Sequence, residues 1–60
     1  MYLFEANYTN RETDERRTKT IEIDSQFFNS EEDVYKYAIG IAFKNKKYNE
    51  VFDSLEFIAV

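Results

Sequence analysis

The chain lacks most of the residue types on which protein chemistry commonly depends. Its 60 residues contain no Cys, His, Trp or Pro and only one Gly. Without cysteine there is no disulfide framework and no thiolate zinc cage, and without histidine there is no imidazole for zinc binding or acid–base catalysis. Serine–histidine and cysteine–histidine nucleophile pairs are excluded for the same reason. We therefore expect a protein that is not an enzyme and that holds no cofactor or metal ion.

Length and charge further restrict the class of protein to which this chain can belong. Sixty residues form one small α+β domain, residues 1–60, near the lower size limit for folding without a disulfide or a metal. Eight Lys and Arg against 12 Asp and Glu give a net charge of -4, which is opposite in sign to that of a general nucleic-acid binder. The 43% hydrophobic and 33% charged residues are typical of a folded soluble domain.

The start of the chain predicts its compartment. Met1 directly precedes a strand pattern, and no apolar run follows a basic segment as it would in a signal peptide. No apolar run approaches the roughly 20 residues of a membrane helix. We expect a complete reading frame and a location in the reducing cytoplasm, with no membrane partner.

Alternating hydrophobicity predicts three strands. Residues 2–9 alternate cleanly, residues 10–17 form a polar hairpin tip, and residues 18–24 are rich in β-branched side chains. Residues 54–60 alternate again. Val51 and Phe52 either belong to this last strand across a bulge or cap the end of the preceding helix.

A helix is predicted between the second and third strands. Ser30 is suited to cap its first turn, where Glu31, Glu32 and Asp33 meet the positive end of the helix dipole. The helix should run to about Lys47. Its apolar arc comprises Val34, Ala38, Ile41, Ala42 and Tyr48.

The predicted order is β-β-α-β, an α+β fold. We expect a three-stranded, mainly antiparallel sheet of strand order 2-1-3 with one helix packed on one face, because right-handed crossovers often pass over a hairpin partner. The alternative places the third strand beside the second in a mixed sheet. The face under the helix should hold Phe4, Ala6, Ile21, Ile23, Leu55 and Phe57.

The face away from the helix is predicted to be acidic through its middle. Glu5, Glu22 and Glu56 each occupy an outward position in a strand. If the registers agree, they form a row of carboxylates, which like-charge repulsion makes unfavourable in the absence of a basic partner. If the registers are offset, they are an ordinary solvated surface.

Association is the remaining route to stability for so small a core. Several apolar residues lie outside the predicted core: Leu3, Ile39, Phe43, Ile58 and Val60. They indicate contact with another protein or with a second copy in a homodimer, unless each is exposed singly, as is common.

Two function classes follow. The first is a small acidic, non-enzymatic protein-interaction module that self-associates and binds another protein; in size and composition it resembles accessory and inhibitor proteins of phages and prophages. The alternative is a nucleic-acid-binding protein that uses the hairpin tip and the end of the helix. Its contacts would be basic residues: Arg16, Arg17, Lys19, Lys44, Lys46 and Lys47. The three helix-end lysines are also explained by helix termination.

Overall fold

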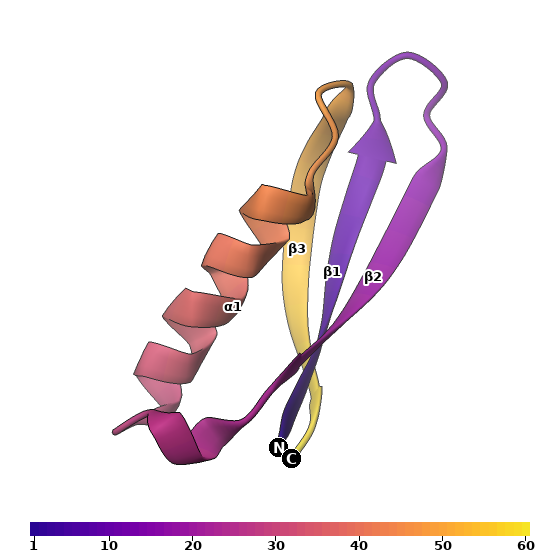
Figure 1. Ribbon diagram of the computed structural model, residues 1–60. Coiled ribbons are helices and arrows are strands. Elements are labelled where there is room, and N and C mark those ends of the chain that lie inside the picture. Colours follow the sequence, from indigo (N-terminus) through magenta and orange to yellow (C-terminus); the bar gives the residue numbers. More distant parts are fainter.

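The computed structural model describes the backbone of residues 1–60 and the side chains of residues 1–24 and 26–60. Its elements follow the chain in a simple order, which Figure 1 shows as a ribbon. They are β1 (Tyr2–Asn10), β2 (Arg16–Ile23), the short 3-10 helix η1 (Ser25–Phe27), α1 (Glu31–Asn45) and β3 (Glu50–Ala59). The molecule is elongated, with extents of 39 × 18 × 13 Å.

The sheet has the strand order β2-β1-β3, with β1 antiparallel to both neighbours. The predicted order and the single helix are therefore confirmed, and the mixed sheet with the third strand beside the second does not form. β3 begins at Glu50 and its register with β1 shifts between Asn7 and Tyr8. Val51 and Phe52 accordingly belong to β3, across a bulge, as the first of the two predicted alternatives has it.

The tip of the β1–β2 hairpin is organised by Asn10. Its side-chain oxygen accepts hydrogen bonds from the backbone N–H groups of Glu12 and Thr13, and its backbone pairs with Asp14 and Glu15. Asp14 adopts a positive φ of 61°, a conformation that Asp and Asn tolerate better than most residues. An Asx-type turn thus closes the hairpin without glycine.

The core lies between α1 and the first two strands. Its buried residues are Phe4, Ala6, Tyr8, Ile21, Ile23, Val34, Ala38 and Ala42. Small residues at Ala38 and Ala42 let the helix approach the sheet closely, while Phe4, Tyr8 and the two isoleucines fill the remaining volume. The alternation in β1 and β2 was therefore predicted correctly.

Two residues expected to be covered are exposed. Phe57 lies on the helix side of the sheet as predicted, where it pairs with Phe4, but it is 53% exposed because it lies on the edge strand. Tyr48 was predicted to belong to the apolar arc of the helix but is 83% exposed. The helix ends at Asn45, two residues before the expected Lys47, so Tyr48 lies in the turn that follows.

Ser30 caps the start of α1 as predicted. Its side chain accepts a hydrogen bond from the backbone N–H of Asp33, and its own backbone is extended. The three carboxylates of the first turn face the positive end of the helix dipole. Phe28, just upstream, packs against the core cluster and against Tyr37, with ring centroids 5.2 Å apart.

The other end of α1 is capped by side chains from the sheet. The last carbonyls of a helix have no partner within it. Here the Tyr8 hydroxyl donates to the carbonyl of Ala42, and the Arg17 guanidinium donates to that of Asn45 at 3.0 Å. The helix C-terminus is thereby bonded directly to β1 and β2.

Arg17 also forms a bidentate ion pair with Glu50, the first residue of β3. Its Nε and Nη2 atoms lie 2.9 and 2.7 Å from the two carboxylate oxygens, and the backbone N–H of Lys47 donates to the same carboxylate at 2.9 Å. The guanidinium carbon lies 4.4 Å from the centre of the Tyr8 ring. We call Tyr8, Arg17 and Glu50 the capping cluster.

The capping cluster shifts the acidity of its members. Hydrogen bonds from Arg17 hold the pKa of Glu50 at about 2, below its ordinary value of 4.5, and outweigh the opposing effect of burial. Burial raises the pKa of Tyr8, although the neighbouring Arg17 acts in the opposite direction.

The first prediction concerns the hydroxyl of Tyr8. Tyr8→Phe keeps the buried ring but removes the donor to the Ala42 carbonyl, so the free energy of unfolding should fall by about 1–3 kcal/mol. Urea denaturation followed by circular dichroism measures this loss. Tyr48→Phe is the matched control, since Tyr48 is exposed, and it should change stability by less than about 0.5 kcal/mol. Equal effects of the two substitutions would contradict the role given to Tyr8.

The second prediction concerns pH. Because the pKa of Glu50 is lower in the folded state than in the unfolded state, its contribution is fully present above about pH 4.5 and is lost as the pH falls through about 2. The urea midpoint of the wild type should therefore fall across this window. In Glu50→Gln the midpoint should be lower at pH 7 and fall less on acidification. Parallel pH curves for the two proteins would exclude Glu50 as the group responsible.

Candidate functional site: the open face of the sheet

The face of the sheet away from α1 is uncovered by any other element, and we call it the open face. In Figure 1, α1 lies on the other side of the strands from the open face. Paired residues of neighbouring strands point to the same side, so the registers define its members. They are Leu3, Glu5, Asn7 and Thr9 of β1, Arg16, Thr18, Thr20 and Glu22 of β2, and Val51, Asp53, Ser54, Glu56 and Ala59 of β3.

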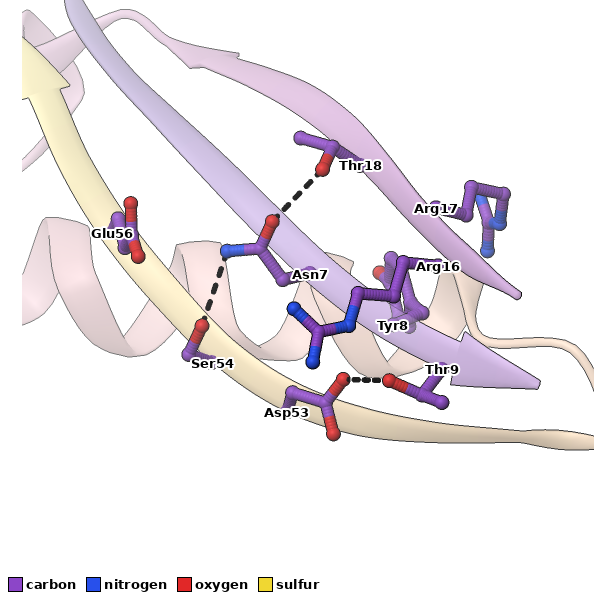
Figure 2. Close-up of a pocket in the computed structure, with 9 residues that line it drawn as sticks. All are labelled: Asn7, Tyr8, Thr9, Arg16, Arg17, Thr18, Asp53, Ser54 and Glu56. Atoms are coloured by element: carbon purple, nitrogen blue, oxygen red, sulfur yellow. Dashed lines mark hydrogen bonds between the residues drawn. The ribbon is translucent and has the colours of Figure 1, made fainter. Parts of the chain in front are cut away.

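Hydrogen-bonded side chains cross the open face in its half nearer the hairpin tip. The Thr18 hydroxyl donates to the side-chain oxygen of Asn7 at 2.9 Å, and the amide nitrogen of Asn7 donates to the Ser54 hydroxyl at 3.1 Å. Figure 2 shows this chain of contacts running across all three strands. Because Asn7 uses both ends of its amide, the amide is held in one orientation.

The bulge in β3 adds a second contact beside the first. Thr9 donates a hydrogen bond to the carboxylate of Asp53, so two successive residues of β3 face the same side. The side chain of Arg16 extends over the same region, toward Asp53 and Asn7 (Figure 2). Together these residues line an open polar concavity of about 490 Å³, whose opposite end is formed by Glu56.

The middle of the open face carries a pair of carboxylates. Glu5 is the register partner of Glu56 on one side and of Thr20 on the other. The ion pairs formed by the described side chains are Arg17–Glu50 and Lys36–Glu32, so neither of these two carboxylates is neutralised by a salt bridge there. Two like charges directly across a strand pair destabilise the sheet.

The third predicted glutamate lies outside this pair. Glu22 is the register partner of Leu3, one cross-strand row away from Glu5 and Glu56 on the open face. The three carboxylates therefore share a face but do not form the straight row expected for agreeing registers. The acidic feature of the open face is the Glu5–Glu56 pair.

The apolar residues predicted for association lie in two separate places. Phe43, near the helix C-terminus, is 58% exposed and packs against Phe52 with ring centroids 4.9 Å apart. Ile39 is half-buried on the same helix. Leu3, Ile58 and Val60 lie at the opposite end of the sheet, where Leu3 is half-buried and Val60 is 81% exposed.

The predicted nucleic-acid contacts are also divided. Arg17 is bonded to Glu50 and to the helix C-terminus, whereas Arg16 lies on the open face. Lys19 pairs in register with the buried Ala6, which places it on the side of the helix. Lys44, Lys46 and Lys47 lie at the end of α1, where the backbone N–H of Lys46 donates to the carbonyl of Phe43. Arg16 and Lys19 therefore lie on opposite sides of the sheet, and Arg17 contacts the helix end that carries the three lysines.

A second hollow was missed by the sequence analysis. Between the N-terminal half of α1 and the end of β3 lies a mainly apolar groove of about 360 Å³. Its walls are Tyr2, Phe4, Glu31, Val34, Tyr35, Phe57 and Val60. The sequence signal was the third strand itself, which is apolar on both faces at Phe57, Ile58 and Val60.

The residues that the structure describes also lack two features. They contain no group of three or more Asp or Glu side chains placed to hold a metal ion. No helix among them has the length and apolar character needed to cross a membrane.

The third prediction tests the carboxylate pair. Glu5→Gln or Glu56→Gln removes the repulsion and should raise the free energy of unfolding by about 0.2–1 kcal/mol at low salt, and by less in high salt. The double variant should gain less than the sum of the single gains, because either change alone relieves the repulsion. Glu12→Gln, at the exposed hairpin tip, removes the same charge and is the control. A gain of the same size in that control would assign the effect to net charge instead.

Comparison of the chain with protein-family models, with curated proteins and with solved structures found no match.

Proposed function

We propose that this protein is a small acidic, non-enzymatic protein-interaction module whose open face binds a basic surface of another protein. The observation that carries the proposal is the Glu5–Glu56 pair. Both carboxylates point to the same uncovered side of the sheet, in adjacent strands, without a salt bridge to any described side chain of the chain itself.

The pair is suited to receive a cation. A lysine or arginine side chain placed between two carboxylates replaces their mutual repulsion by two attractions, so binding gains more than it would from an isolated glutamate. The net charge of -4 adds long-range attraction for a basic partner. The neighbouring concavity offers hydroxyl and amide groups for hydrogen bonds at the rim of the contact.

This chemistry favours one class of target. A basic protein surface is commonly one that binds the phosphates of nucleic acids. A small acidic module that occupies such a surface would act as its inhibitor. That role agrees with the resemblance in size and composition to accessory proteins of phages and prophages, and we propose the cytoplasm as its compartment.

Self-association is a separate prediction, and the fold does not test it. The apolar residues expected to mediate it are exposed in part at both ends of the molecule. The mass of the purified protein in solution, measured by analytical ultracentrifugation over a range of concentrations, distinguishes a monomer from a homodimer.

The fourth prediction tests the proposed function. Tagged wild-type protein is used as bait in a bacterial lysate, with and without nuclease treatment, beside a Glu5→Gln/Glu56→Gln variant and a Glu12→Gln/Glu15→Gln variant. The two double variants lose the same charge, but only Glu5→Gln/Glu56→Gln loses it on the open face. We expect a stoichiometric protein partner with the wild type and the tip variant, and its loss with the open-face variant.

Two results would contradict the proposal. Equal loss of the partner in both double variants would assign the effect to overall charge. Recovery of nucleic acid, lost after nuclease treatment or at high salt, would favour the alternative function and direct attention to Arg16 and the lysines at the end of α1.

A further inference from the structure

The outer edge of β3 is not paired with another strand. β3 is hydrogen-bonded to β1 on one side, and the sheet order places no strand on the other. An edge strand offers a row of backbone N–H and C=O groups that an extended segment of another chain can use to add a further strand. β2 is the other edge of the same sheet.

Charge distinguishes the two edges. Apart from Glu50, which is buried and paired with Arg17, residues 50–60 contain two anions, Asp53 and Glu56, and no Lys or Arg. Apart from Arg17, β2 contains two cations, Arg16 and Lys19, against the single anion Glu22. Basic residues on an edge repel a basic strand, so a basic segment is attracted to β3 and disfavoured at β2.

The two sides of β3 also differ in chemistry. On the open face Glu56 is exposed and stands next to Glu5. On the helix side the next residue, Phe57, is 53% exposed and forms a wall of the apolar groove with Tyr35 and Val60. A strand added along this edge would place successive side chains alternately beside Glu56 and beside the groove.

From these observations we propose that the outer edge of β3 binds an extended basic segment of the partner protein as a fourth strand. The segment alternates Lys or Arg, directed to Glu56 and Glu5 on the open face, with apolar side chains that enter the groove beside Phe57 and Tyr35. The inference rests on the proposed function and specifies the partner's segment by its period-two pattern. Backbone pairing supplies affinity, and the alternating side chains supply specificity.

The paired region is short. The register of β3 with β1 shifts on both sides of Ser54–Phe57, so the regular stretch that contains Glu56 and Phe57 is limited to these residues. Bulges of this kind limit how far an edge can pair. The central contact is therefore the segment's basic residue beside Glu56 and its apolar residue beside Phe57.

A second copy of this chain fits the edge poorly. Pairing β3 with β3 of another molecule would bring together two strands that carry only negative charges. Pairing it with β2 of another molecule would match the charges but would place the polar Arg17 and Lys19 side of that strand at the apolar groove. A segment from a different protein is the better match.

The experiment measures binding of labelled peptides to the full chain by fluorescence anisotropy. The probe is a peptide of about eight residues that alternates lysine and valine. One control has the same composition with all lysines before all valines, and a second is the alternating peptide with alternate backbone nitrogens methylated. We expect the alternating peptide to bind at least about tenfold more tightly than either control, because only it combines the pattern with free backbone donors.

Matched variants locate the contact. Glu56→Gln should weaken binding of the alternating peptide about 2- to 5-fold, whereas Glu12→Gln should leave it unchanged. Tyr35→Ser should weaken binding through the groove, whereas Tyr37→Ser, on the same helix but outside the groove, should not. Circular dichroism and urea denaturation confirm that each variant is folded.

The outcomes separate this inference from the proposed function. Equal binding of the alternating, block-ordered and methylated peptides, all weakened by Glu56→Gln, would overturn strand addition while supporting an acidic interaction surface. No binding of any peptide, or a homodimer whose formation blocks the alternating peptide, would also overturn it. The proposed function is tested separately by capture from lysate, and it fails if the captured partner is indifferent to Glu5 and Glu56, if both double variants lose the partner equally, or if nucleic acid is recovered instead.

Discussion

The capping cluster is the interaction on which the arrangement of the molecule depends. Tyr8, Arg17 and Glu50 come from all three strands. Tyr8 and Arg17 donate hydrogen bonds to carbonyl groups at the C-terminal end of α1, and Glu50 accepts from Arg17. In a chain without cysteine, and so without a disulfide, this cluster connects the helix to the sheet at a defined point. The turn from α1 into β3 is fixed by the same carboxylate, since Glu50 also accepts from the backbone of Lys47.

The position of this attachment leaves two surfaces available. One helix of 15 residues covers one face of the sheet only, so the opposite face stays open. The helix is attached to the sheet near Glu50, and the groove lies toward the other end, where Tyr35 and Phe57 are exposed between α1 and β3. The acidic pair and the groove thus lie on opposite sides of the same edge strand.

Much of this fold was predictable because it depends on local signals. Alternation in β1 identifies the buried Phe4 and Tyr8, and Ser30 with three following acids marks the helix start. The register of β3 with β1 was not predictable, because it depends on a bulge, and no residue type in the sequence marks the position of that bulge. That bulge makes Glu56 the partner of Glu5 and brings Asp53 and Ser54 to the open face. Arg17 was assigned to a solvated tip because the strand was expected to begin at Thr18, two residues after its start at Arg16.

The edge strand sets a limit on what this protein can bind. A long, flat apolar edge would pair indiscriminately and aggregate, and natural sheets avoid this with bulges and charges. β3 has both, since register shifts flank Ser54–Phe57 and Glu56 lies within that stretch. Backbone pairing over so few residues is weak, so binding needs the salt bridge on one side and the apolar contact on the other. This edge therefore rejects a segment that offers only the salt bridge or only the apolar contact. Its selectivity follows from the short length of the stretch that can pair.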